Sequence, residues 1–161
     1  MGPGADPATR EAVTQAVKDL SEAIGELRDL ARGIHPAVLS EAGLQTALGS
    51  LLDRSPLPAR LDVRLAEEPP AAVAAAAYFA ISEALTNVLK HARATDVLVE
   101  VTESGGTLRI LVMDDGVGGV DPRAGSGLRG LADRIDAAGG TLGVTSPASG
   151  GTRLEVSLPC E

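Results

Sequence analysis

Hydrophobic and polar residues follow the period of an amphipathic helix over residues 9–34. The apolar positions recur four and three residues apart, a heptad seam that favours packing against another helix: Val13, Val17, Leu20, Ile24, Leu27, Ala31 and Ile34. The alternative is a helix lying on its own domain. Gly25 and Gly33 weaken an isolated helix, so one arm of a helical bundle is the favoured interpretation. Pro36 stops this helix near His35.

From residue 40 onward the pattern changes several times between helical and strand periods. Ser40 stands where an N-cap is needed for a second helix, and the alternation from Leu61 to Leu65 predicts a strand with one face in water. Glycine pairs mark two hairpin turns and the end of a helix. The predicted elements are helices at 40–52, 71–92 and 128–138 and strands at 61–65, 96–103, 107–113, 141–146 and 152–158.

These elements define the expected fold class. About five strands joined largely by hairpins imply a mixed, mostly antiparallel sheet, and about three helices on one of its faces give a two-layer α/β sandwich. A doubly wound α/β fold is the alternative, but hairpin turns stand where its helical crossovers would be needed. The expected domains are a tag or disordered terminus at 1–5, a long helix at 6–39 and the sandwich at 40–161.

Composition and charge narrow the functional classes. The net charge of −8 argues against a nucleic-acid partner, because phosphates need a basic patch. Aromatic residues make up only 1% of the chain, so its core must consist of Ala, Val, Leu and Ile. The single Cys160 excludes an internal disulfide. Charged and amide residues interrupt the apolar run from Val73, so we expect no transmembrane helix, no signal peptide and a cytoplasmic fragment without membrane contact of its own.

The central helix carries a polar column on its otherwise apolar surface. Glu83, Asn87 and His91 are four residues apart and share one face, with Lys90 beside them. A solvated helix face is the simple alternative for three polar residues. An acid, an amide and a base in one column are also the groups that a binding site for a charged ligand needs.

Two glycine motifs follow the central helix within about fifty residues. The first is Asp114-Asp115-Gly116-Val117-Gly118 at the end of an apolar strand, where glycines let the backbone approach a ligand closely. The second is Gly125-Ser126-Gly127-Leu128-Arg129-Gly130 at the start of a helix, where free N–H groups and the helix dipole favour phosphate. Each motif alone is a weak signal, but their order after the polar helix is specific.

This ordered set resembles the ATP-binding catalytic domain of sensor histidine kinases, which belongs to the wider group of Hsp90, DNA gyrase B and MutL. The residues look most like the short-lid subfamily of the nitrate-sensor and DesK kind. The resemblance covers residues 40–159. Residues 30–39 are similar to the end of the second dimerisation helix of these kinases.

The resemblance implies ATP and Mg²⁺ as ligands and gives each motif residue a role. Asn87 would be the protein ligand of Mg²⁺, with Glu83 orienting a water, and Lys90 or His91 would approach the phosphates. Asp114 would bind the adenine amino group, because the D-x-G-x-G spacing selects it over Asp115. Gly116 and Gly118 would lie along the base, and residues 121–124 would form the lid. Gly125, Gly127 and Leu128 would contact the phosphates, and Thr152 would lie near the adenine.

Plain structural roles compete with some of these assignments. A surface or helix-capping histidine is the alternative for His91, and an ordinary β-branched strand residue is the alternative for Thr152. His35 precedes a proline at a helix end and is interpreted as structural.

The phosphate acceptor is not found in this sequence. The family places its phosphorylated histidine before an acid, and no His-Asp or His-Glu pair occurs here. We therefore expect a catalytic fragment of a histidine kinase that does not autophosphorylate alone. Its expected partners are the acceptor helix of the parent kinase, a response regulator receiver domain and a second copy through the N-terminal helix. Whether the parent protein is membrane-anchored stays open.

Two other functions remain at this point. An anti-sigma-type protein serine kinase shares the ATP-site motifs, although the heptad helix and residues 30–39 speak against it. A regulatory or dimerising module with a vestigial nucleotide site is the non-enzymatic alternative. The intact Glu83, Asn87 and Asp114 and the glycines speak against that reading.

Overall fold

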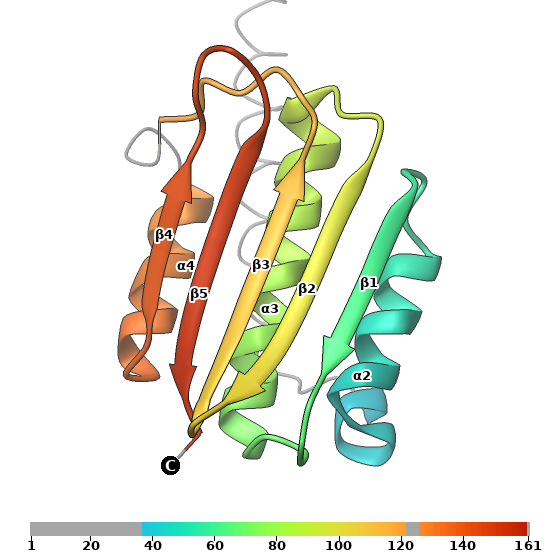
Figure 1. The fold of residues 1–161 in the computed structure, drawn as a ribbon, viewed down its shortest axis with the longest axis vertical. Helices are drawn as coiled ribbons and strands as arrows, with labels where there is room; N and C mark the ends of the chain where they lie inside the picture. The colour runs from blue at the N-terminus through green and yellow to red at the C-terminus, as the bar shows by residue number, and fades with distance from the viewer. Residues whose placement is uncertain (1–36, 122–125, 161) are drawn as a thin grey trace, which may run out of the picture. The chain divides into compact units, whose positions relative to one another are not determined.

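The computed structural model describes residues 37–121 and 126–160. Three α-helices, one π-helical turn and five strands make up this part of the chain (Figure 1). In chain order they are α2 (Ala37–Asp53), β1 (Ala59–Arg64), α3 (Ala71–Asn87), η1 (Val88–Ala92), β2 (Val97–Ser104), β3 (Thr107–Asp114), α4 (Ser126–Ala137), β4 (Thr141–Thr145) and β5 (Thr152–Pro159). The helix expected at 9–34, the rest of the expected segment 6–39 up to residue 36, including His35, and the terminus at 1–5 lie outside the described residues.

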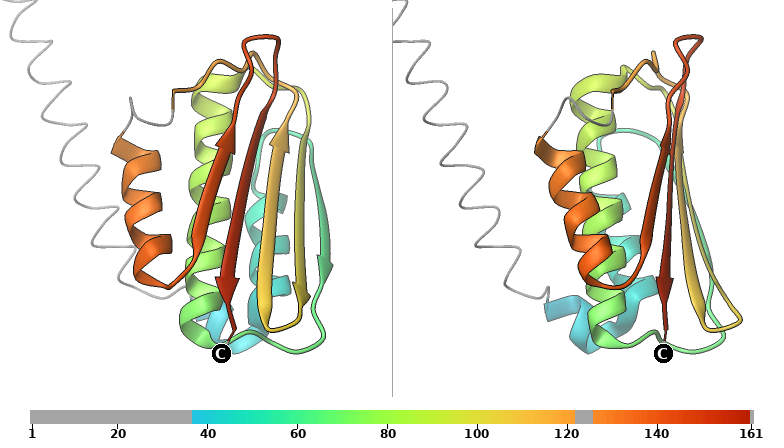
Figure 2. Two further views of the ribbon diagram at one scale, coloured as in Figure 1. Left: turned by 60° about the vertical axis from the view of Figure 1, so that its left-hand side comes forward. Right: turned by 90° about the vertical axis from the view of Figure 1, so that its left-hand side faces the viewer.

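The five strands form one mixed sheet in the order β1-β2-β3-β5-β4. The β2–β3, β3–β5 and β4–β5 pairs are antiparallel, whereas β1 and β2 are parallel because α3 makes the crossover between them. All three helices cover the same face of the sheet, which leaves the other face open (Figure 2). The two-layer α/β sandwich predicted from the sequence is therefore confirmed.

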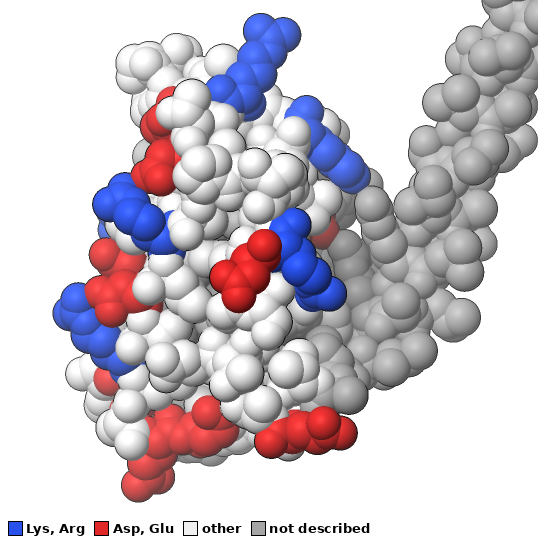
Figure 3. All heavy atoms as spheres, turned by 90° about the vertical axis from the view of Figure 1, so that its right-hand side faces the viewer, with Lys and Arg blue, Asp and Glu red and all other residues white. Residues whose placement is uncertain are grey.

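Strand β1 forms one edge of this sheet and carries both acidic and basic side chains. Arg64 pairs with Asp62 along the strand, and Arg60 reaches Asp96 at 2.6 Å. Figure 3 shows the side of the domain that carries β1 and α2, where acidic and basic side chains are interspersed and acidic ones gather toward the lower edge. Such exposed pairs add little stability, but charges along an edge strand discourage pairing with other chains.

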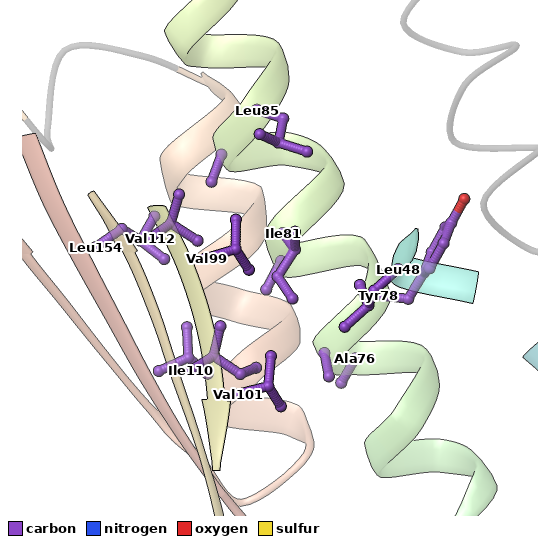
Figure 4. Close-up of a cluster of buried hydrophobic side chains, with 14 of the residues drawn as sticks. Leu48, Ala76, Tyr78, Ile81, Leu85, Val99, Val101, Ile110, Val112 and Leu154 are labelled. Carbon is purple, nitrogen blue, oxygen red and sulfur yellow. The ribbon is translucent and has the colours of Figure 1, made fainter. Parts of the chain in front are cut away.

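The core lies between α3 and the covered face of the sheet (Figure 4). Strands β2, β3 and β5 send alternate residues toward the helices, and these are buried because the side-chain period of a strand is two. Ile81 of α3 is fully buried against them. Apart from Tyr78, the buried hydrophobic residues of the described chain are aliphatic, as the composition predicted.

Helix α3 together with η1 is long and apolar enough to span a membrane by length and composition alone. More than half of its most apolar stretch, 56%, is buried inside the domain. Several of its small residues, among them Ala76, Ala77 and Ala80, are buried and let the helix approach its neighbours closely. This is the behaviour of a core helix, and it is the only helix of this kind in the part of the chain that the structure describes.

The N-cap predicted at Ser40 is wrong. The helical conformation already begins at Ala37, and the break comes at Gly43, whose φ of 79° and ψ of 172° are not helical. The helix resumes at Leu44, whose N–H donates to the Glu68 carboxylate at 2.5 Å. The cap thus comes from a residue 24 positions away, which local sequence preference does not reveal.

Candidate nucleotide site

The polar column lies where α3 changes from an α-helix into a π-helix. The α-helix ends at Asn87, and Val88–Ala92 form a π-helical turn that Arg93 closes in the left-handed conformation with φ of 52°. The expectation of a continuous α-helix to Ala92 is wrong in this last turn. π-Helical turns of this kind are frequent at functional sites. Here the turn carries Lys90 and His91, both of which are exposed.

The beginning of α4 faces this column. A Cβ atom on Gly127 would lie 2.5 Å from Oε1 of Glu83 and 4.0 Å from Oδ1 of Asn87. Glycine at this position therefore lets the N-terminus of α4 approach the acid and the amide of α3. A helix N-terminus attracts anions, and the contact brings it next to side-chain oxygens of Glu83 and Asn87.

The side chain of Asn87 is unusual within the described residues. Its Nδ2 is buried and has no hydrogen-bond partner, which is costly for an amide group. Residues held in unfavourable arrangements are often retained for function. The sequence motif had independently indicated Asn87 as a site residue. The Oδ1 atom is the one nearer to Gly127.

Asp114 ends β3 on the same side of the sheet as the helices. Side chains two residues apart in a strand lie on the same face, so Asp114 points, like the buried Ile110 and Val112, toward the helical layer. Its Oδ1 accepts a hydrogen bond from the Gly116 N–H at 2.8 Å, which fixes the carboxylate at the start of residues 115–120, the glycine loop. Its neighbour on β5 is Thr152.

Backbone contacts hold this glycine loop in place. A Cβ on Gly116 would clash with the Ala92 carbonyl, and that carbonyl accepts the Val117 N–H at 2.8 Å. On the other side, the Gly151 N–H donates to the Gly116 carbonyl at 2.6 Å, and a Cβ on Gly118 would clash with the Pro147 carbonyl. The glycines are therefore needed because the π-helical turn and the β4–β5 hairpin pack directly on the loop.

Asp115 points to different partners from Asp114. Its carboxylate accepts hydrogen bonds from the Thr95 hydroxyl at 2.5 Å, the Thr95 N–H at 2.7 Å and the Asp96 N–H at 3.0 Å. These bonds, the Thr95 hydroxyl first, lower the pKa of the Asp115 carboxyl from 3.8 to about 2. Asp115 thereby clasps the turn between η1 and β2, and this structural role supports Asp114 as the ligand-binding carboxylate.

The structure adds two residues that sequence reasoning missed. Thr95 is half of the Asp115 clasp, and Ser146 links the glycine loop to Thr152, at 3.0 Å between the two hydroxyl oxygens. Neither residue has a motif spacing that would have selected it. Their partners lie 20 and 6 positions away in the chain and come close only through the turns.

Some predicted site residues cannot be described. Residues 122–125, which include most of the expected lid and Gly125, lie outside the described part of the chain. Leu128 is half-buried and packs against the core, and a role for it at the phosphates is not tested by these contacts.

The site offers few protein ligands to a metal. Within residues 37–121 and 126–160, no group of three or more His, Cys, Asp or Glu side chains could hold a metal ion. Asn87 and Glu83 supply oxygen atoms near the N-terminus of α4. That sparse oxygen set fits Mg²⁺, which keeps several waters and takes substrate phosphates as ligands.

The comparison with known families identifies the class of this domain. Residues 72–161 match the family described as histidine kinase-, DNA gyrase B-, and HSP90-like ATPase. The chain belongs to this family. The match contains both glycine motifs and the polar helix, so the resemblance drawn from the sequence is confirmed.

The similar proteins are sensor kinases. The chain is 30% identical to the sensor histidine kinase MctS of Rhizobium johnstonii, over 91% of this chain and 34% of that protein. It is 32% identical to the nitrate/nitrite sensor protein NarQ of Escherichia coli, over 86% of this chain and 26% of that protein. Among solved structures, the blue-light activated histidine kinase EL346 of Erythrobacter litoralis gives a TM-score of 0.62 at 26% identity, covering 74% of this chain and 41% of that one. The chain thus spans about a third of the length of the curated relatives it matches.

Proposed function

We propose that this domain binds Mg-ATP and positions its γ-phosphoryl group for transfer to a histidine on an acceptor helix of a sensor histidine kinase. The observation that carries the proposal is the position of Gly127, whose absent side chain lets the N-terminus of α4 approach Glu83 and Asn87. Family membership supports ATP as the nucleotide. The similarity to sensor histidine kinases supports histidine as the acceptor in two-component signalling.

The base would bind where β3 ends and β5 begins. Asp114 is a fixed carboxylate acceptor suited to the adenine amino group, and its hydrogen bond with Gly116 leaves Oδ2 for that contact. Gly116 and Gly118 would lie along the base, in a loop that packs against the Ala92 and Pro147 carbonyls. Thr152 is the neighbouring hydroxyl on β5.

The phosphates would lie between α3 and α4. Asn87 would hold Mg²⁺ through Oδ1, Glu83 would orient a water molecule of the ion, and Gly127 would offer its backbone to phosphate oxygens, with Gly125 and Leu128 beside it. Lys90 or His91 on the π-helical turn would add positive charge. When bound, Mg²⁺ neutralises the charge that develops on the transferring group, and catalysis otherwise rests on positioning.

The acceptor and the signalling partners would come from other segments or proteins. No His-Asp or His-Glu pair occurs in the sequence, so the phosphorylated histidine would be on an acceptor helix supplied by the parent kinase. A response regulator receiver domain would take the phosphoryl group from it. The acceptor helix and the receiver domain fit a cytoplasmic placement of this domain, whether or not the parent kinase is membrane-anchored. Residues 6–39 would provide dimerisation.

A two-stage experiment tests the proposal. The chain is first titrated calorimetrically with a non-hydrolysable ATP analogue, with Mg²⁺ and with excess EDTA. It is then incubated with Mg-ATP, alone and with a separate acceptor helix carrying His-Glu, or with a sigma-antagonist protein as a serine substrate. We expect Mg²⁺-dependent binding, no self-labelling and acid-labile label on the acceptor helix. Acid-stable label on the antagonist instead would favour the serine kinase, and no nucleotide binding would favour a vestigial site.

A further inference from the structure

Ser146 joins three segments at the base end of the site. It follows β4 at the start of the β4–β5 hairpin, and its carbonyl accepts the Gly119 N–H at 3.3 Å. Its Oγ accepts the Val120 N–H at 3.1 Å and lies 3.0 Å from Oγ1 of Thr152. The residue therefore connects the glycine loop with the first residue of β5.

Either hydroxyl can donate in the Ser146–Thr152 hydrogen bond, and the neighbouring contacts favour one direction. A hydroxyl group has one proton to donate and two lone pairs to accept with. The Val120 N–H occupies an acceptor position on Ser146, so the Ser146 proton is available for donation. Its candidate acceptors are Thr152 Oγ1 at 3.0 Å and the Gly151 carbonyl at 3.5 Å. The shorter distance favours Thr152, which frees the Thr152 proton for another acceptor.

The position of Thr152 indicates which group would accept its hydroxyl proton. Thr152 is paired in register with Asp114, and both side chains lie on the covered face of the sheet. A carboxylate acceptor beside a hydroxyl donor complements adenine, which presents an amino group next to the unprotonated N1. Guanine presents a carbonyl next to an N1–H, so both contacts would be mismatched.

We infer that Ser146 is a positioning residue for base recognition: it orients the Thr152 hydroxyl as a donor to N1 of adenine. The inference rests on the proposed nucleotide site and adds to it a residue outside every motif. The directed series runs from the Val120 N–H to Ser146, from Ser146 to Thr152, and from Thr152 to the base. Hydrogen bonds arranged in such a series reinforce one another.

The test compares ATP with 1-deaza-ATP, which keeps the amino group but lacks the N1 acceptor. Affinities are measured for the unaltered chain, Ser146→Ala, Thr152→Val and the double variant. Ser149→Ala is the matched control, because Ser149 is an exposed serine in the same hairpin. Thermal unfolding of each variant verifies that it is folded.

We expect Ser146→Ala to weaken ATP binding by about 3- to 10-fold, the effect of one net hydrogen bond, and to leave 1-deaza-ATP almost unaffected. The double variant should be no weaker than Thr152→Val, since both hydroxyls act in one series. Equal weakening of both nucleotides, or additive effects, would overturn the role of Ser146 while leaving the ATP site intact. If Ser146→Ala does not fold, Ser146→Gly takes its place with the same expected outcome, and equal affinity of the unaltered chain for the two nucleotides overturns the inference by itself. Absence of ATP binding by the unaltered chain would overturn the proposed function as well.

Discussion

Asp114 and Thr152 are register partners across the β3–β5 ladder, and both side chains point to the helix-covered face of the sheet. Directly opposed residues of an antiparallel pair have neighbouring Cβ atoms. The sequence separates the two residues by the whole of α4 and β4. Strand pairing brings the two side chains together and gives an otherwise aliphatic face of the sheet one polar end.

Replacing Asp114 by Asn should weaken adenine nucleotides selectively. The amide loses the charge-assisted part of the contact and can turn its own donor toward the adenine amino group. We expect a loss of about 1–3 kcal/mol in binding free energy, measured by calorimetric titration. Asp115→Asn is the matched comparison, because that carboxylate faces Thr95 and Asp96. A larger loss from Asp115→Asn would assign the base contact to Asp115.

Replacing Asn87 by Ala should abolish Mg²⁺-dependent ATP binding and leave the domain folded. The substitution removes the oxygen expected to hold the metal, together with a buried Nδ2 that has no partner within the described residues. Because no protein hydrogen bond of Nδ2 is lost there, thermal unfolding should occur at nearly the same temperature. Unchanged affinity in the presence of Mg²⁺ would remove Asn87 from the metal role.

Two glycines of α4 provide a matched pair of substitutions. A Cβ on Gly127 would lie 2.5 Å from the Glu83 carboxylate, whereas a Cβ on Gly130 would meet nothing within 4 Å. Gly130→Ala should stabilise the helix by up to about 1 kcal/mol and leave nucleotide affinity unchanged. Gly127→Ala should push the Glu83 carboxylate away from the N-terminus of α4 and reduce ATP affinity by at least about 10-fold, or about 1.4 kcal/mol. Equal affinities of the two variants, measured side by side, would contradict the proposed phosphate site.

The Asp115 clasp should make stability depend on pH in acid. The pKa of Asp115 is about 2 in the folded domain and 3.8 by reference, so the unfolded chain binds the proton more readily. The stabilisation is therefore fully present above about pH 4 and is lost as the pH falls toward 2. The difference in unfolding free energy between the unaltered chain and Asp115→Asn, from urea titrations, should be constant from pH 7 to 5 and shrink below pH 4.

Thr95→Val serves as the second arm of that experiment, because the Thr95 hydroxyl is the largest cause of the lowered pKa. This variant should show a smaller acid dependence of the same sign. An acid dependence identical in all three proteins would mean that Asp115 does not contribute to it.

The core also makes a prediction that is independent of nucleotide. Ile81 is fully buried between α3 and the sheet, and its replacement by Ala removes that packing and leaves a cavity. We expect a loss of about 2–5 kcal/mol in unfolding free energy, measured by chemical denaturation. Leu89→Ala is the control, because Leu89 is 48% exposed on the same helical run, and it should cost far less.

The sequence by itself determined the layout of the sandwich. Strand alternation and helical periodicity depend on which face of each element is buried, and that information is local. The predicted strands at 107–113 and 152–158 each fall one residue short of β3 and β5 at one end. The glycine motif after β3 was equally readable, because close backbone approach leaves glycine as the residue that fits, as at Gly116 and Gly118. Asp114 was selected by its spacing to those glycines.

Only the tertiary structure decided the contacts between distant turns. The cap of Leu44 comes from Glu68, the clasp of Thr95 from Asp115, and the link from Ser146 to the glycine loop spans 26 residues. The π-helical turn at Val88–Ala92 and the parallel pairing of β1 with β2 likewise went unpredicted. Each depends on which segments the sheet register brings together, and a single polar side chain in a turn carries no periodic signal of its eventual partner.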